Sequence, residues 1–137
     1  LEALSRYEGN RFVMVSPEEL KVPSYVKQHL KNNHIPYTQT TDLTQALPEL
    51  DVLYMTRVQK ERFFNEADYI RLKDSYVLTP QKLEGAKENL IIMHPLPRVN
   101  EISVAIDRDP RACYFKQVLN GKYMRMALIL MMLEGEK

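Results

Sequence analysis

Arg57 and Gln59 are the residues whose types and spacing best fit the binding of a small molecule. They follow an apolar run at 52–55 that has the length of a buried strand. In an open parallel sheet, ligands bind outside the carboxyl ends of the strands, where both side chains can face one crevice. A guanidinium offers a fork of donors to a carboxylate, and a carboxamide offers a donor and an acceptor. The pattern therefore predicts a site for a small carboxylic acid. If the segment after the strand is helical, Glu61 lies one turn beyond Arg57 and could orient its guanidinium.

A second segment with unusual chemistry, His94 to Arg98, follows the apolar run at 90–93. Because proline lacks a backbone N–H and restricts the residue before it, the stretch 95–97 can continue neither a strand nor a helix. We expect a turn with unpaired carbonyls that accept hydrogen bonds from an amine or amide, and the bond between Leu96 and Pro97 is a candidate for the cis isomer. His94 is assigned to fixing the backbone of this turn rather than to catalysis.

The strings around both segments allow a comparison with known families. Tyr-Met-Thr-Arg-Val-Gln-Lys-Glu-Arg at 54–62 and His-Pro-Leu-Pro-Arg-Val-Asn-Glu at 94–101 resemble the signatures of the aspartate-binding half of the aspartate carbamoyltransferases. Similar agreement runs from about the start of the chain to Leu133, including Asn-Gly at 120–121 and Arg-Met-Ala-Leu at 125–128. The resemblance therefore covers nearly the whole chain.

The resemblance implies a role for individual residues. Arg57 and Gln59 would bind aspartate, and the main chain at Leu96 and Pro97 would contact carbamoyl phosphate. It implies no catalytic residue in this chain, no cofactor and no metal. Residues in supporting positions would be Pro95, Glu61, Arg98 and Arg125.

The activity implied is transfer of the carbamoyl group from carbamoyl phosphate to the amine of L-aspartate, giving N-carbamoyl-L-aspartate and phosphate, in cytoplasmic pyrimidine biosynthesis. Enzymes of this family also have an N-terminal carbamoyl-phosphate domain with a Ser-Thr-Arg-Thr loop, and residues 1–137 contain no such string. We therefore expect 1–137 to be one aspartate-binding domain, N-terminally truncated and inactive alone. Its implied partners are the missing domain and further full-length chains in a homotrimer, with or without regulatory chains.

Two alternatives stay open. One is a noncatalytic module that binds small carboxylates or acts in regulation. The other is an ornithine-type carbamoyltransferase, which the positive charge of Arg57 disfavours because it would repel the side-chain cation of ornithine. Pro95 also disfavours it, because the ornithine enzymes have His-Cys-Leu-Pro at this point.

The composition narrows the class of protein. With 45% hydrophobic residues, 137 residues are enough for one domain with a core. The 19 basic and 18 acidic residues nearly cancel, so no nucleic-acid partner is expected. Cys113 is the single cysteine, which excludes an intrachain disulfide and fits a reducing compartment. The apolar stretch at 126–133 is far shorter than the ~20 residues that cross a bilayer, so no membrane partner is expected.

Strand-like and helix-like segments alternate along the chain, which predicts an α/β fold: a doubly wound, mostly parallel sheet with helices on both faces, like that of the aspartate and ornithine carbamoyltransferases. Thr41 and Asn65 are expected to cap helices, and Asn120 with Gly121 to separate two C-terminal helices. The last of these, 123–133, is apolar on every side from 126 to 133 and is expected to pack against the missing domain. The strands are expected at 12–15, 35–40, 52–55, 76–78 and 91–93, and the helices at 23–32, 41–47, 66–72, 79–86, 109–120 and 123–133.

Overall fold

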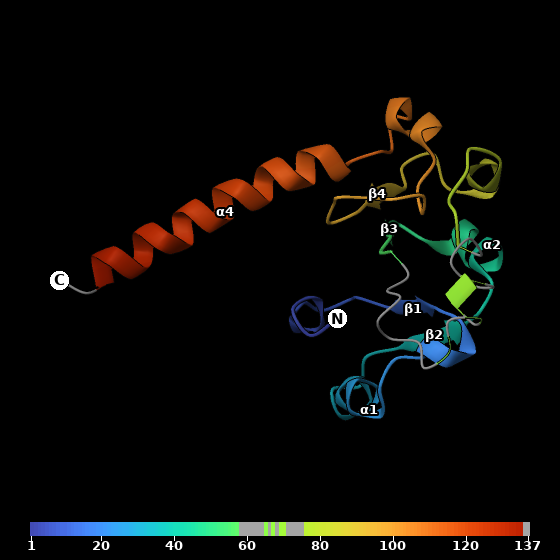
Figure 1. The fold of residues 1–137 in the computed structure, drawn as a ribbon. Coiled ribbons are helices and arrows are strands. Elements are labelled where there is room, and N and C mark those ends of the chain that lie inside the picture. The colour runs from blue at the N-terminus through green and yellow to red at the C-terminus, as the bar shows by residue number, and fades with distance from the viewer. Residues whose placement is uncertain (58–64, 66, 68, 71–75, 136–137) are drawn as a thin grey trace.

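The computed structural model describes residues 1–57, 65, 67, 69–70 and 76–135 (Figure 1). Its strands pair in parallel, as predicted. β1 (Phe12–Val15) pairs with β2 (Tyr37–Thr40), and β3 (Val52–Tyr54) pairs with β4 (Ile91–Met93). Within the described residues these are two separate two-stranded sheets rather than one continuous sheet. The strand expected at 76–78 is reduced to a single parallel bridge between Leu78 and Ile102.

The first half of the chain forms the helices that separate β1, β2 and β3. The first element is one 3-10 turn, η1 (Leu4–Arg6), and it is followed by Gly9, whose φ of 79° lies in the left-handed region. A second such turn, η2 (Glu18–Leu20), leads to α1 (Ser24–Asn32), which begins after Pro23 as expected. These elements connect β1 to β2 over a length sufficient for a parallel crossover.

The cap of α2 (Leu43–Ala46) differs from the prediction by one residue. The carboxylate of Asp42, not the hydroxyl of Thr41, accepts from the backbone amides of Thr44 at 2.8 Å and Gln45 at 3.4 Å. A carboxylate makes the stronger cap because its charge also interacts favourably with the positive end of the helix. The 3-10 turn η3 (Leu47–Glu49) then leads into β3.

Two further helix predictions have mixed outcomes. Asn65 does act as a cap, accepting from the amide of Ala67 at 2.9 Å, but most of the expected helix at 66–72 lies outside the described residues. Ile70, within that range, is 59% exposed. The helix expected at 79–86 is a 3-10 turn, η5 (Gln81–Gly85), with Leu83 buried as predicted.

The main hydrophobic core surrounds β3 and β4. Leu53 of β3 and Ile92 of β4 lie at its centre, and Ile106 of the 3-10 turn η6 (Val104–Arg108) packs with them. These buried side chains anchor β3 and β4 in the core. The other core residues are Leu43, Leu47, Met55, Leu78, Leu83, Leu90, Ile102 and Tyr114.

The C-terminal part is one continuous helix, α4 (Tyr114–Gly135), so the predicted break at Asn120 and Gly121 was wrong. Gly121 does not adopt a positive φ, and a helical glycine costs only about 1 kcal/mol relative to alanine, which neighbouring good helix formers tolerate. Figure 1 shows α4 projecting from the rest of the chain. Apolar side chains are exposed along it, such as Met132 at 74%. No helix within the described ranges is long and apolar enough to cross a membrane.

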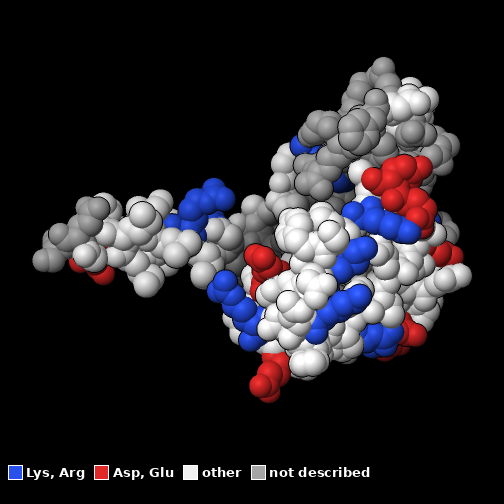
Figure 2. Space-filling model, turned by 90° about the horizontal axis from the view of Figure 1, so that it is seen from below, with Lys and Arg blue, Asp and Glu red and all other residues white. Residues whose placement is uncertain are grey.

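The helix also begins later than predicted. Asp109 accepts from the amide of Arg111 at 2.9 Å, and the chain then runs beside β4 before α4 starts. There, the amide of Ile92 donates to the carbonyl of Arg111, and the amide of Cys113 donates to the carbonyl of Ile92, both at 2.9 Å. On the face shown in Figure 2, acidic and basic side chains are interspersed over the body of the molecule, in keeping with the balanced composition.

Candidate functional site

The pairing of β3 with β4 places both predicted binding segments at one edge of a parallel sheet. Tyr54 is the partner of Met93, and the amide of Met55 donates to the carbonyl of Met93 at 2.9 Å. Arg57 follows two residues beyond Met55, and Leu96 follows three residues beyond Met93. Because the strands are parallel and in register, both segments leave the sheet at the carboxyl ends of the strands, where open α/β sheets bind ligands.

Arg57 is exposed, and no group in the described part of the chain forms a hydrogen bond or ion pair with it. A guanidinium at such a position offers paired donors to a carboxylate. Gln59 and Glu61, the other residues predicted in this segment, lie outside the described residues.

The turn after β4 has the special backbone that its prolines predict. The peptide bond between Leu96 and Pro97 is cis, which confirms that prediction, and Leu96 has a φ of 49°. Positive φ is disfavoured for leucine, so the surrounding contacts must hold it. Among the described residues, no group donates a hydrogen bond to the carbonyls of Pro95 or Leu96. These two carbonyls are thus free to accept one.

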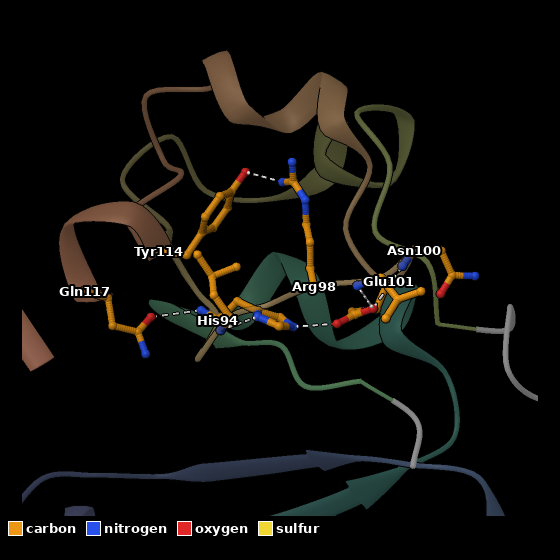
Figure 3. A network of polar contacts seen from close by, with 8 residues as sticks. His94, Arg98, Asn100, Glu101, Tyr114 and Gln117 are labelled. Atoms are coloured by element: carbon orange, nitrogen blue, oxygen red, sulfur yellow. Dashed lines mark hydrogen bonds and ion pairs between the residues drawn. The ribbon is translucent and has the colours of Figure 1, made fainter. Parts of the chain in front are cut away.

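His94 supplies one of the contacts that hold this backbone, as the sequence predicted. Its Nδ1 accepts from the amide of Leu96 at 2.9 Å, so the ring proton must be on Nε2, which then donates to Oε1 of Glu101 at 2.7 Å (Figure 3). The His94 side chain is almost completely buried. The imidazole is therefore neutral in this arrangement and positions the turn through both ring nitrogens.

Glu101 ties the far end of the same turn. Its Oε2 accepts from the amides of Val99 at 3.0 Å and Asn100 at 3.1 Å. Burial raises the pKa of Glu101, but bonds from backbone amides and from His94 outweigh this effect, so the pKa lies below its usual range. An ionised carboxylate and a neutral imidazole thus clamp the whole segment 94–101.

Arg98 is held within this chain rather than presented freely to a ligand. Its guanidinium binds both carboxylate oxygens of Asp107, with Nη2 and Oδ2 2.6 Å apart, and lies 5.7 Å from the ring centroid of Tyr114. The bonds from Arg98 and then Tyr114 lower the pKa of Asp107 to about 2. Burial and the bond to Asp107 raise the pKa of Tyr114 to about 12. This cluster joins the turn to η6 and to the start of α4.

The remaining predicted residues and two residues that the sequence did not single out complete the site. Arg125 is exposed on α4, well along the helix from the turn, and Pro95 is exposed within the turn itself. Glu101 ends the string 94–101 but was assigned no role, and Gln117 had no periodic or motif signal of its own. Gln117 Oε1 accepts from the amide of His94 at 2.9 Å, a contact between residues 23 apart that no local pattern reveals.

Among the described residues, no group of three or more histidine, cysteine, aspartate or glutamate side chains is arranged to hold a metal ion. The described groups at this edge are the guanidinium of Arg57, the carbonyls of Pro95 and Leu96 and the turn that carries them. Such groups bind and orient ligands and stabilise charge.

Comparison with known proteins agrees with this arrangement. Residues 1–132 match the family described as aspartate/ornithine carbamoyltransferase, Asp/Orn binding domain. The aspartate carbamoyltransferase catalytic subunits of Lachnoclostridium phytofermentans and Finegoldia magna are 60% and 59% identical to this chain, over 97% of its length in each case. The chain spans only 44% of the length of either relative.

Solved structures give the same result. The catalytic subunit of M. jannaschii aspartate transcarbamoylase is similar with a TM-score of 0.86 and 41% identity, over 97% of this chain and 44% of that one. The aspartate transcarbamoylase of Trypanosoma cruzi, solved in complex with carbamoyl phosphate and aspartate, is similar with a TM-score of 0.76 and 34% identity, over 87% of this chain and 40% of that one.

Proposed function

The chain belongs to the aspartate/ornithine carbamoyltransferase family, and we propose on that basis that it is the aspartate-binding domain of an aspartate carbamoyltransferase. The reaction is transfer of the carbamoyl group from carbamoyl phosphate to L-aspartate, giving N-carbamoyl-L-aspartate and phosphate. The relatives are named for this activity, and the T. cruzi enzyme was solved with both substrates.

The observation that carries the proposal is the in-register parallel pairing of β3 with β4. Because of this pairing, the segments that carry Arg57 and the carbonyls of Pro95 and Leu96 both follow the carboxyl ends of adjacent strands, which supports a shared site. Arg57 binds a carboxylate of aspartate, with Gln59 beside it and Glu61 orienting the guanidinium. The main chain at Leu96 and Pro97 binds the carbamoyl group, whose NH₂ is a donor that needs acceptors.

In the reaction, the α-amine of aspartate attacks the carbonyl carbon of carbamoyl phosphate. A C–N bond forms, the bond from carbon to the phosphate oxygen breaks, and the nitrogen loses a proton that balances the departing phosphate. Arg57 fixes the position of the amine, and the Leu96 turn fixes the carbonyl carbon that it attacks. Positioning and electrostatic stabilisation account for the rate, and no covalent enzyme intermediate is needed.

The groups that bind phosphate belong to a carbamoyl-phosphate domain, which residues 1–137 do not contain, so this chain alone has no turnover. Residues 123–133 of α4 pack against that domain, which explains the exposed apolar side chains. Pro95, Arg98 and Arg125 have supporting roles only. The working enzyme is a cytoplasmic homotrimer in de novo pyrimidine biosynthesis, with or without regulatory chains, and it needs no cofactor.

The charge at Arg57 separates this proposal from the ornithine-type alternative. The side chain of ornithine carries a cation that a nearby guanidinium repels, whereas aspartate offers a carboxylate. Binding of ornithine but not of aspartate would therefore reject the proposal in favour of that alternative.

Titration calorimetry and an activity assay test the proposal together. L-Aspartate and its analogue succinate are titrated into the 137-residue chain. The same chain is then joined to the N-terminal half of the Lachnoclostridium phytofermentans catalytic subunit and assayed for carbamoyl aspartate. We expect turnover only in the joined polypeptide. Binding of aspartate without turnover in the joined polypeptide would indicate a noncatalytic carboxylate-binding module, and turnover by the isolated chain would refute the claim that it is inactive alone.

A further inference from the structure

We propose that Gln117 of α4 is a positioning residue that holds the carboxyl ends of β3 and β4 together and so sets the geometry of the Leu96 turn. This inference deepens the carbamoyl transfer proposed above, and its predicted effect on catalysis rests on that function. Its predicted effect on the structure of the turn does not, and that effect can be measured separately.

The first argument is the direction of the amides along β4. Ile91 and Met93 use their backbone groups toward β3, as in the bond from Met55 to the carbonyl of Met93. The alternate residues face the other side, where Ile92 bonds to both Arg111 and Cys113. His94 is next on that side, and a strand continuing beyond Cys113 would supply the acceptor for its amide.

No strand continues there, because the chain turns into α4 at Tyr114. The carboxamide of Gln117 takes the place of the missing strand, and its Oε1 accepts from the amide of His94 at 2.9 Å (Figure 3). His94 is 1% exposed, so this amide cannot turn to bulk water for an alternative partner. An unpaired buried amide is costly, which gives the Gln117 side chain a defined task.

The second argument is the other end of the same carboxamide. Gln117 Nε2 donates to the hydroxyl of Tyr54 at 3.1 Å. Tyr54 is the last residue of β3 and lies three residues before Arg57, while His94 lies two residues before Leu96. One side chain therefore contacts both strands just before the segments that bind the two substrates.

The effect on the turn passes through His94. Gln117 holds the backbone of His94, and the His94 ring holds the amide of Leu96 at 2.9 Å. A shift of α4 would thus move the Leu96 carbonyl, which links the seating of the exposed helix to the geometry of the site. Displacements of about 1 Å at a reacting centre cost on the order of 100-fold in rate.

The test compares three variants of the joined polypeptide described above. Gln117→Leu keeps the bulk of the side chain and removes both hydrogen bonds, and we expect kcat/KM to fall about 10- to 100-fold. Gln117→Glu keeps an acceptor for His94, and the Tyr54 hydroxyl can reverse its role and donate to the carboxylate. We expect this variant to stay within about threefold of the parent, because both links survive. Asn120→Leu, the matched control one turn along α4 at an exposed position, should leave kcat/KM unchanged.

Amide hydrogen exchange on the same polypeptides gives a readout that does not depend on turnover. Exchange over residues 94–98 should be faster in Gln117→Leu than in the parent, and equal to the parent in Gln117→Glu and Asn120→Leu. If the parent joined polypeptide shows no carbamoyl transfer, the proposed function is wrong, but amide hydrogen exchange still tests the role of Gln117. The inference is overturned if Gln117→Leu leaves exchange over 94–98 unchanged, or if an active Gln117→Glu variant is as impaired as Gln117→Leu.

Discussion

Nδ1 of His94 accepts a hydrogen bond from the amide of Leu96, two residues further along the same turn, at 2.9 Å. A protonated Nδ1 could not accept this bond, so the ring must be neutral while the turn is formed. The other ring nitrogen donates to Glu101, whose second oxygen binds two more amides of the turn. The backbone that carries the Leu96 carbonyl therefore depends on one imidazole and one carboxylate.

Removal of His94 should destabilise the fold more than a typical substitution does. In His94→Ala, the carboxylate of Glu101 loses its buried partner and the amide of Leu96 loses its acceptor, so we expect a loss of about 3 kcal/mol in the free energy of unfolding. His94→Asn retains an oxygen near the position of Nδ1, and its loss should be smaller. Urea denaturation of both variants measures the effect, with the exposed His34→Asn as control. Equal stability of His94→Ala and the parent would contradict a structural role for the ring.

The ion pair of Asp107 and Arg98 should make stability depend on acid pH. In the unfolded chain Asp107 takes up a proton near its ordinary pKa of 3.8, whereas in the folded chain the pKa is about 2. The folded state therefore binds fewer protons between these values, and the contribution of this pair, complete above pH 3.8, is lost as the pH falls toward 2. Glu101, whose pKa is also lowered, adds to the loss in the same direction.

Asp107→Asn tests this dependence. The variant should be less stable than the parent at neutral pH, and the difference should shrink as the pH falls toward 2, because protonation then removes the ion pair from the parent as well. Denaturant unfolding at several pH values measures it, with the exposed carboxylate variant Glu84→Gln as control. A constant difference across this range would show that the pair does not account for the pH dependence.

Tyr114 should produce the opposite dependence at alkaline pH. Burial and the bond to Asp107 raise its pKa from 10.0 to about 12 in the folded chain. Its contribution is complete below pH 10, where both states keep the proton, and it is lost as the pH rises toward 12. Between pH 10 and pH 12, the free energy of unfolding of Tyr114→Phe should therefore fall less than that of the parent. The exposed Tyr7→Phe should show the same pH dependence as the parent. Parallel curves for Tyr114→Phe and the parent would contradict the shift.

The parts of this structure that the sequence predicts are those determined by neighbouring residues. The apolar runs become β1, β3 and β4, and the alternating prolines produce the special turn with its cis bond. Proline and apolar periodicity act within a few residues, so they can be recognised without the fold. The failure at Gly121 has the converse cause: a turn signal was present, but the good helix formers on both sides let α4 continue through it.

The parts that the sequence could not predict depend on contacts between distant residues. The backbone amide of His94 donates to the side chain of Gln117, 23 residues away. The side-chain amide of Gln117 donates to the hydroxyl of Tyr54, 63 residues away. Each of these residues alone looks like an ordinary polar side chain. Similarly, Arg98 was predicted only to have a supporting position, whereas it binds Asp107 and Tyr114 of this chain, a pairing that only the position of η6 reveals.

Arg57 gives the most direct test of the proposed site. Its guanidinium has no partner in the described part of the chain and lies past the end of β3, so its substitution should reduce ligand binding without unfolding the core. Hydrogen bonds to charged groups contribute about 1.5–3 kcal/mol, so Arg57→Ala should weaken aspartate binding about 10- to 100-fold. Arg57→Lys keeps the charge but loses the paired donors, and we expect an intermediate loss of aspartate affinity.

Calorimetry with aspartate and succinate measures both variants, and the exposed Arg108→Ala, outside the turn, is the matched control. Unchanged aspartate affinity in Arg57→Ala would place the carboxylate site elsewhere, whereas equal losses in Arg57→Ala and Arg108→Ala would reduce the role of Arg57 to general charge attraction.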